Sequence, residues 1–298
     1  MKISARKTAD SMCLVDCVAK AAFVGMPCDE RGEQAVSALR DRGIAVHHLV
    51  YMPETISLSL DGEKLECDEL SEWLSDHKTS WLLEGTTLGT TELVLATKEV
   101  LSCGSSALCY LYVEPQRYKR QEHRRVIHAR DFSLTRESNG FQAVPGFAYM
   151  LDEGSSQSVL FFLGFEGERL DQAFEQLPIQ PRTASAVFGV PAFQPGWEVD
   201  SFANNARLLR ERGIGSSLYY CGANDAATTF RLLERIYGEK PSDQRLFVAP
   251  IGTKPQCIGL ALFLANHCDV GFIYDHPVRG IGRSTGAGSW HVFDVAEA

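Results

Sequence analysis

The sequence lacks any apolar run long enough to cross a membrane, which takes about 18 or more consecutive residues. Charged side chains such as Lys2, Arg6 and Asp10 are interspersed among the apolar residues at positions 1–26, unlike the uninterrupted apolar core of a signal peptide. We therefore expect neither a membrane span nor a signal peptide. These absences predict a cytoplasmic protein that makes no membrane contact.

An excess of positive charge is also missing, since 29 Lys and Arg stand against 38 Asp and Glu and give a net charge of −9. This balance argues against broad nucleic-acid coating, but a small anionic ligand can still be bound by local charge. The local exception is Arg117–Arg130, which holds six basic residues and two histidines. A solvated segment is the plain interpretation. The alternatives are an arm that lines an anion site or contacts a protein partner, and a nucleic-acid contact is the least favoured.

Common catalytic and metal-binding motifs are absent as well. The chain has no Walker loop, no Gly-x-Ser-x-Gly elbow and no His-Glu-x-x-His pair. Its nine cysteines are odd in number and lie mostly in apolar segments, which predicts reduced, buried thiols. Cys13, Cys17 and Cys28 could be offered as metal ligands, but no second Cys or His pair completes a tetrahedral set. We expect no metal ion and no bound cofactor, and we assign no catalytic residue.

The most informative stretch is Leu246–Pro277. An apolar run is broken at Ile251–Pro255, continues as an uncharged apolar segment of helical length, and closes on a second apolar run at Val270–Tyr274. This pattern predicts a βαβ unit. Gly252 lets the backbone approach a ligand closely, and the helix N-terminus offers unpaired N–H groups beside the ammonium group of Lys254. The turn therefore suits an anion.

The same pattern occurs earlier in the chain, at Trp81–Pro115, with a Gly/Thr turn at Thr86–Thr91. Upstream, Leu39–Ile44 matches Leu209–Ile214, and each segment is expected to end a helix and lead into a strand. The three anchors keep the same order, with separations of 170, 163 and 162 residues. The sequence therefore predicts an internal duplication.

Strands and helices are expected to alternate along both halves of the chain. Such alternation demands a mainly parallel sheet with helices on both faces. The sequence therefore predicts an α/β protein of two tandem Rossmann-like domains, at residues 1–120 and 158–298, joined by a basic, irregular connection at 121–157. We expect the first strand near Met12–Val18 and a closing strand at Trp290–Val295.

The candidate phosphate contacts lie at the carboxyl ends of strands, where ligands of parallel sheets bind. The ammonium group of Lys254 would neutralise a phosphate, and the N–H groups of Gly252 and Thr253 would cradle it. A solvated lysine that holds nothing is the alternative. In the first half, a weaker mirror-image contact is expected from Thr87, Gly89 and Thr90.

Further candidates follow other strands of the second half. The side chains expected beside the ribose or base, including an indole that could stack, come after a glycine turn or in an aromatic loop. They are Glu166, Arg169 and Trp197, and Gly164 of the glycine turn is a further ligand-binding candidate. The glycine-rich loop after the last of these strands carries Arg279 and Arg283. No helix is expected after this loop, so it is no dinucleotide fingerprint, and we interpret it as a flexible loop that contacts an anion.

The strand, the turn Gly252–Pro255, the buried helix and the strand after it, preceded by a short helix after Asn224-Asp225, resemble part of a known family. They are similar to the C-terminal portion of CARF (CRISPR-associated Rossmann-fold) sensor domains and their relatives in antiphage defence. In that family a Gly-Thr-Lys turn contacts a cyclic oligonucleotide messenger, and the sensors form dimers with the ligand across the two-fold axis. The resemblance covers about Val159–Pro277. The chain departs from it at Ile251, where the family usually has another glycine, and no usual fused effector is recognisable.

The resemblance implies a tandem sensor whose two halves imitate the dimer and whose output passes to a protein effector. Two other functions stay open. The first is an enzyme that acts on a nucleotide or phosphorylated small molecule, such as a messenger-degrading nuclease, because polar side chains stand at strand ends. These side chains are Glu84, Glu114, Asp225, Asp275, His276 and Ser284. Asp275 and His276 are adjacent on a strand and point to opposite faces, which favours a structural role. The second is an interaction subunit that binds no small ligand.

Overall fold

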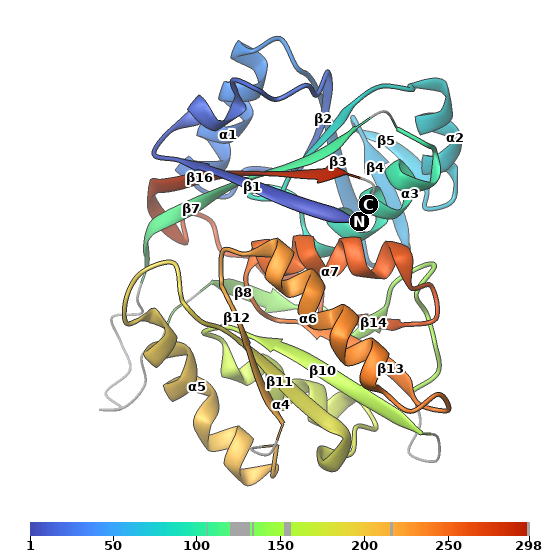
Figure 1. The fold of residues 1–298 in the computed structure, drawn as a ribbon, viewed down its shortest axis with the longest axis vertical. Helices are drawn as coiled ribbons and strands as arrows, with labels where there is room; N and C mark the ends of the chain where they lie inside the picture. The colour runs from blue at the N-terminus through green and yellow to red at the C-terminus, as the bar shows by residue number, and fades with distance from the viewer. Residues whose placement is uncertain (106, 120–131, 133, 152–155, 215–216, 297–298) are drawn as a thin grey trace. The chain divides into compact units, whose positions relative to one another are not determined.

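The computed structural model describes residues 1–298 except 106, 120–131, 133, 152–155, 215–216 and 297–298 (Figure 1). The described residues form two compact units. Unit 1 comprises Met1–Tyr118 and Ile281–Ala298, and unit 2 comprises Lys119–Gly280. Both are α/β structures with a central sheet, as the alternation of strands and helices predicts.

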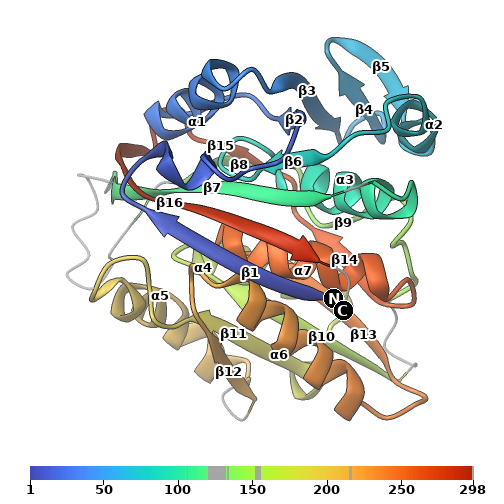
Figure 2. The same cartoon turned by 45° about the horizontal axis from the view of Figure 1, so that its top comes forward.

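Unit 1 contains an eight-stranded sheet of mixed direction. Its elements are β1 (Lys2–Thr8), the 3-10 turn η1 (Ser11–Leu14), β2 (Ala21–Val24), α1 (Glu30–Asp41), β3 (Ala45–Met52), β4 (Ser57–Leu60), β5 (Glu63–Glu66), α2 (Glu69–Asp76), β6 (Trp81–Glu84), α3 (Thr90–Ser102), β7 (Leu108–Tyr118) and β16 (Ser284–Ala296). The strand order is β1-β16-β7-β6-β2-β3-β4-β5. The central strands β7, β6, β2 and β3 are parallel, whereas the strands on either side of them are antiparallel. Figure 2 shows β1, β16 and β7 side by side.

Short-range sequence signals explain several of these boundaries. The Asp61-Gly62 pair joins β4 to β5 with φ angles of 52° and 91°, as a two-residue hairpin turn with two left-handed residues requires. β4 and β5 therefore form an antiparallel hairpin. The expectation that the first strand lies near Met12–Val18 is wrong. The first strand is β1 at residues 2–8, and the 3-10 turn η1 occupies part of Met12–Val18. Pairing of β1 with the distant β16, at register Lys2↔Ala296, explains why this polar segment is ordered.

Unit 2 is a doubly wound, Rossmann-like unit. Its main elements are β10 (Gln157–Leu163), α4 (Gly167–Gln176), η2 (Pro181–Thr183), β11 (Ala184–Gly189), α5 (Trp197–Glu211), β12 (Leu218–Cys221), α6 (Ala226–Glu239), β13 (Arg245–Pro250), α7 (Lys254–Asn266) and β14 (Gly271–Tyr274). The sheet order is β12-β11-β10-β13-β14-β9, and the strands from β12 to β14 are parallel. The chain therefore reverses its winding direction between β10 and β13, which is the position where such sheets bind ligands.

Two helix pairs complete unit 2. Alternate residues of β10, Val159, Phe161 and Leu163, pack in one cluster with Leu170 of α4 and Leu208 of α5. The helices α6 and α7 pack against each other (Figure 1). A Cβ atom on Gly259 of α7 would collide with the carbonyl oxygen of Ala226, so this helix contact needs glycine. The uncharged sequence of α7 fits its burial on all sides, since residues 255–264 are all buried.

The boundaries of the two units differ from the expected division at 120 and 158. β16 pairs antiparallel with β7 and β1, so Ser284–Ala296 lies in unit 1 although we expected it to close the second half. The expected connection at 121–157 also contributes strands to unit 2. These are β8 (Thr135–Ser138), which pairs with β15 (Pro277–Arg279), and β9 (Gln142–Ala143), which pairs with β14.

The internal duplication stays a prediction. In both units the first parallel strand lies beside the strand that precedes the apolar helix, since β2 neighbours β6 and β10 neighbours β13. However, α1 leads to β3, next to β2, whereas α5 leads to β12, two positions from β10. Unit 2 therefore has an additional helix and strand, α4 and β11, between its first parallel strand and the helix compared with α1.

The match between Leu39–Ile44 and Leu209–Ile214 has a local explanation. In both segments the glycine has a left-handed φ angle, of 71° for Gly43 and 72° for Gly213. The following isoleucine N–H donates to the leucine carbonyl at the start of the segment, at 3.1 Å in the first and 2.9 Å in the second. This is the Schellman helix ending. The shared residues therefore reflect a common way to end a helix.

Candidate functional site

The turn between β13 and α7 lies at the point where unit 2 reverses its winding direction. Thr253 is the N-cap of α7 and forms a capping box with Gln256, whose Oε1 accepts the Thr253 N–H at 3.0 Å. The Thr253 hydroxyl donates to the Ala223 carbonyl at 2.5 Å. Gly252 and Lys254 are half-buried, and a Cβ atom on Gly252 would meet Gln256 Oε1. We expected the N–H groups of Gly252 and Thr253 to bind a phosphate. This expectation is corrected for Thr253, because its N–H is already bonded to Gln256.

The turn after β10 lies directly beside this one. A Cβ atom on Gly164 would be 3.0 Å from the Ile251 carbonyl oxygen, so the two turns are in contact. The Gly164 carbonyl accepts hydrogen bonds from Ser201 Oγ at 2.9 Å and from Asn205 Nδ2 at 2.8 Å. These bonds fasten the turn to α5. Gly164 and Gly252, each expected at a strand end, therefore lie in neighbouring turns of unit 2.

Arg169 and Glu166 are engaged inside unit 2. The Arg169 guanidinium donates to both oxygens of Asp275, at 2.6 and 2.5 Å, and both side chains are buried. Burial alone would lower the pKa of Arg169, but the charge and hydrogen bonds of Asp275 raise it above its ordinary value. Glu166 accepts from the N–H and hydroxyl of Thr135, at 2.7 and 2.8 Å, and lies 3.6 Å from Arg169. The expectation that Arg169 and Glu166 meet a ribose or base is corrected, because their polar groups are taken.

Trp197 is half-buried at the first residue of α5. Its ring meets that of Phe165 edge to face, with centroids 5.8 Å apart and an interplanar angle of 80°. Phe165 directly follows Gly164, so this aromatic pair lies at the carboxyl edge of the sheet. Sequence reasoning found Trp197 in its aromatic loop but missed Phe165, because a single apolar residue after a strand carries no distinctive signal.

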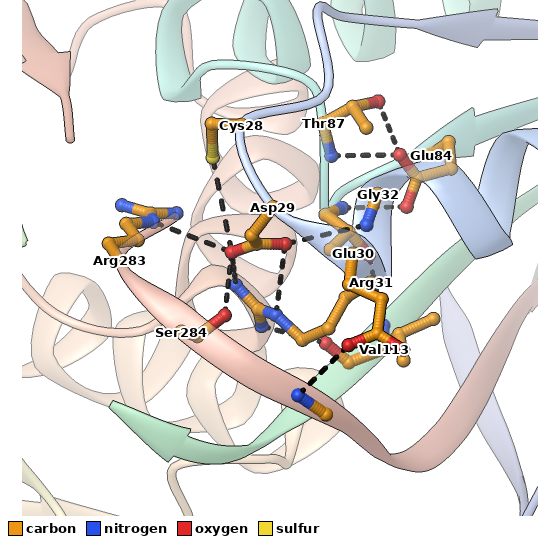
Figure 3. A network of polar contacts seen from close by, with 12 residues as sticks. Cys28, Asp29, Glu30, Arg31, Gly32, Glu84, Thr87, Val113, Arg283 and Ser284 are labelled. Atoms are coloured by element: carbon orange, nitrogen blue, oxygen red, sulfur yellow. Dashed lines mark hydrogen bonds and ion pairs between the residues drawn. The ribbon is translucent and has the colours of Figure 1, made fainter. Parts of the chain in front are cut away.

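In unit 1, the turn between β6 and α3 is filled by a carboxylate of the protein itself (Figure 3). Glu84 is fully buried and accepts from the N–H groups of Thr86 and Thr87, both at 2.8 Å, and from the Thr87 hydroxyl. That hydroxyl also accepts the Gly25 N–H at 2.9 Å. Burial raises the pKa of Glu84, and the hydrogen bonds offset only part of this rise. The N–H and hydroxyl groups of Thr87, which we expected to contact a phosphate, therefore bind Glu84 instead.

A second carboxylate covers the N-terminus of α3. Gly89 is the N-cap, and a Cβ atom there would collide with the carboxylate of Glu92, which occupies the N3 position. Glu92 also accepts the Tyr51 N–H at 3.0 Å, and Thr90 is buried. The expected mirror-image phosphate contact is corrected, because two carboxylates stand beside the groups that were to bind the anion.

A buried ionic cluster at the N-terminus of α1 was missed by sequence reasoning. Asp29 caps the helix and accepts from Arg31 Nη2 at 2.8 Å and from Ser284 Oγ at 2.7 Å (Figure 3). Arg31 also donates to the Val113 carbonyl at 3.0 Å. Burial would raise the pKa of Asp29, but the hydrogen bonds and charge of Arg31 lower it overall. An aspartate before a helix predicts a cap, yet nothing local predicts that Ser284 would reach it.

The glycine-rich loop with Arg279 and Arg283 is divided between the two units. Arg279 ends β15 in unit 2. In unit 1, Arg283 Nε lies 4.0 Å from Asp29 Oδ2, and the side chain is only 14% exposed. The expectation of one flexible anion-contacting loop is therefore corrected. Of the basic segment Arg117–Arg130, residues 120–130 lie outside the described residues.

Five of the six polar strand-end residues named for an enzyme bond to other groups of the protein, namely Glu84, Glu114, Asp225, Asp275 and Ser284. Asp275 pairs with Arg169, and Glu114 lies 2.7 Å from His291 Nε2. Asp225 caps α6 by accepting the Thr228 N–H at 2.8 Å. Among the residues that the structure describes, no group of three or more His, Cys, Asp or Glu is placed to hold a metal ion. Within the same residues, no helix combines the length and apolar character needed to span a bilayer.

Comparison of the chain with known protein families finds no match. Comparison with curated proteins finds no relative either.

Proposed function

We propose that unit 2 binds an anionic, nucleotide-type ligand beside the first turn of α7. The observation that carries this proposal is a difference in charge between two corresponding turns. The turn before α7 has Lys254 at N1 and the neutral Gln256 at N3, whereas the turn before α3 has Thr90 at N1 and Glu92 at N3. Glu84 adds a further carboxylate in unit 1. An anion is thus favoured at α7 and opposed at α3.

The physical basis is the helix N-terminus together with a nearby cation. A helix N-terminus carries about half a positive elementary charge. Lys254 adds a full charge at the first helical residue and is half-buried, so its charge is screened less than that of an exposed lysine. A charge-assisted hydrogen bond contributes roughly 1.5–3 kcal/mol. A phosphate fits the combination of the lysine ammonium group and the positive end of the helix.

The nucleotide class is supported by the aromatic pair at the same sheet edge. Trp197 is half-buried in contact with Phe165 and presents an indole on which a base could stack. The resemblance of the turn to CARF sensors favours a cyclic oligonucleotide. The protein would then act as a regulatory component of a defence system that passes its signal to a protein effector.

Calorimetric titration with a panel of nucleotides and cyclic oligonucleotides tests this proposal. We expect a member of the panel to bind, and Lys254→Ala to weaken its binding at least tenfold, because one charge-assisted contact is lost. Lys78→Ala, which removes an exposed lysine of unit 1, serves as the matched control and should change the Kd less than twofold.

Two results would contradict the proposal. One is a complete panel without a binder, and the other is a Lys254→Ala protein that binds as tightly as the unsubstituted protein. Chromatography of the ligand after hours of incubation separates a sensor from the enzymatic alternative, since a sensor returns its ligand unchanged.

A further inference from the structure

A pair of thiols in unit 1 makes contact across a long sequence separation. The Sγ atoms of Cys17 and Cys109 are 3.5 Å apart, and the two residues are 92 positions apart. Cys17 lies in the segment between η1 and β2 and is half-buried, whereas Cys109 lies on β7 and is buried. Both are free thiols. A disulfide bond has a length of about 2.05 Å, so roughly 1.5 Å of approach would close it.

The surroundings make the two thiols unequal. The hydrogen bond from Cys109 lowers the pKa of Cys17 to about 7, although burial acts in the opposite direction. The pKa of Cys109 is raised well above its ordinary value, first by Cys17 and then by burial. A backbone hydrogen bond at Ala19 also lowers the pKa of Cys17, whereas the charge of Asp294 raises it and the charge of Arg6, bonded to Asp294 at 2.9 Å, acts against that rise. The thiolate is the reactive form of cysteine.

We propose that Cys17 and Cys109 are a peroxide-sensitive pair that forms a reversible disulfide. This inference goes beyond the proposed function of unit 2 and does not depend on its ligand. The pair combines Cys17, a half-buried residue, with the buried Cys109, whose sulfur is already in contact with that of Cys17. A reactive thiol beside a second, resolving thiol is the arrangement used by redox-sensing cysteines.

The chemistry balances with hydrogen peroxide as the oxidant. The Cys17 thiolate attacks one peroxide oxygen, the O–O bond breaks, and the leaving hydroxide takes a proton to become water. Cys17 is then a sulfenic acid. The Cys109 sulfur attacks the Cys17 sulfur, the S–O bond breaks, and the departing hydroxide takes the Cys109 proton and leaves as a second water. Two thiols are oxidised to one disulfide, and one peroxide is reduced to two waters.

The disulfide would connect the segment before β2 to β7. In the sheet, β6 lies between β2 and β7. It would close a long loop of the chain, and closure of a long loop restricts the unfolded state. Oxidation would thus join the N-terminal part of unit 1 covalently to its parallel centre. A dithiol reductant would reverse the link.

Mass spectrometry of the full-length protein tests the pair directly. The reduced protein is treated with an equimolar amount of hydrogen peroxide, free thiols are alkylated, and the non-reduced digest is analysed. We expect a peptide that links Cys17 to Cys109, and its loss after treatment with dithiothreitol. The exposed Cys268 should still be alkylated at this dose, and Cys268→Ser should leave the linked peptide unchanged.

Two variants assign the order of the steps. In Cys109→Ser, we expect Cys17 to stop at the sulfenic acid, which dimedone traps. In Cys17→Ser, we expect Cys109 to remain reduced. The proposal is overturned if the unsubstituted protein yields Cys17 and Cys109 as separately alkylated peptides while Cys268 is oxidised, or if Cys17 is linked to another cysteine instead. This readout on the unsubstituted protein does not require either variant to fold.

Discussion

The turns before α3 and α7 have the same backbone role but opposite electrostatics. Each follows a parallel strand at the reversal point of its sheet and begins an apolar helix. In unit 1, Glu84 accepts the N–H groups of Thr86 and Thr87, and the carboxylate of Glu92 lies against Gly89 at the helix N-terminus. In unit 2, the capping role falls to the neutral Gln256, and Lys254 adds positive charge. A helix N-terminus is thus open to an external anion only where the protein does not supply the anion itself.

The largest expected effect concerns the buried carboxylate Asp275 of unit 2, which is paired with Arg169 where unit 1 leaves carboxylates beside its turn. Arg169→Met would leave Asp275 buried without its cation. Removal of one partner of a buried ion pair costs about 3–5 kcal/mol of the free energy of unfolding. Denaturation in urea measures this loss.

The matched control for Arg169→Met is the double variant Arg169→Met with Asp275→Asn. This variant carries no unpaired buried charge, so it should recover most of the lost free energy of unfolding. A single variant that loses less than about 1 kcal/mol would show that Asp275 does not need Arg169.

The next prediction gives the α7 turn the negative charge that the α3 turn has at N3. Gln256→Glu keeps the size and the capping geometry but adds a negative charge at N3, as Glu92 does in unit 1. Two like charges about 5 Å apart at an effective dielectric constant near 20 repel by about 3 kcal/mol. We therefore expect calorimetry to show a Kd raised roughly a hundredfold for the ligand of unit 2.

Gln244→Glu, which adds the same charge elsewhere in unit 2, is the control for Gln256→Glu. Its Kd should stay within about threefold of the original, because a distant charge is screened by salt. Equal binding by Gln256→Glu and the unsubstituted protein would remove the electrostatic basis of the comparison.

The smallest expected effect concerns pH and the two buried carboxylates of unit 1. The pKa of Asp29 is lowered, so its contribution to stability is present above its unfolded pKa of about 3.9 and is lost as the pH falls through the folded value. The pKa of Glu84 is raised, so its contribution is present below its unfolded pKa of about 4.3 and is lost as the pH rises through the folded value.

Asp29→Asn and Glu84→Gln should therefore differ from the unsubstituted protein in opposite ways. The stability deficit of Asp29→Asn should shrink as the pH falls below about 4, and that of Glu84→Gln should shrink as the pH rises from that region. Urea denaturation across the pH range measures both. Parallel slopes for the two variants would contradict the assigned directions.

Much of the local structure could be predicted from the sequence. The hairpin turn Asp61-Gly62, the glycines that end α1 and α5, and the strand–helix–strand pattern of 246–277 all depend on short-range signals. The Gly252-Thr253-Lys254 turn was found for the same reason, since a break between two apolar runs is visible in one dimension. What those residues contact could not be read in this way. The Thr253 N–H is taken by Gln256, and only the folded turn shows this.

The sequence by itself determined the α/β class and where most helices and strands of the described residues begin and end, because those choices depend on neighbouring residues. Tertiary structure alone decided that β16 joins β1 and β7, that Arg169 meets Asp275 from 106 positions away, and that Glu84 fills its own turn. Such pairings depend on which strand lies beside which in the sheet. A charged residue has the same appearance in the sequence whether its partner is water, a ligand or a buried side chain, and only the fold brings one of these partners to it.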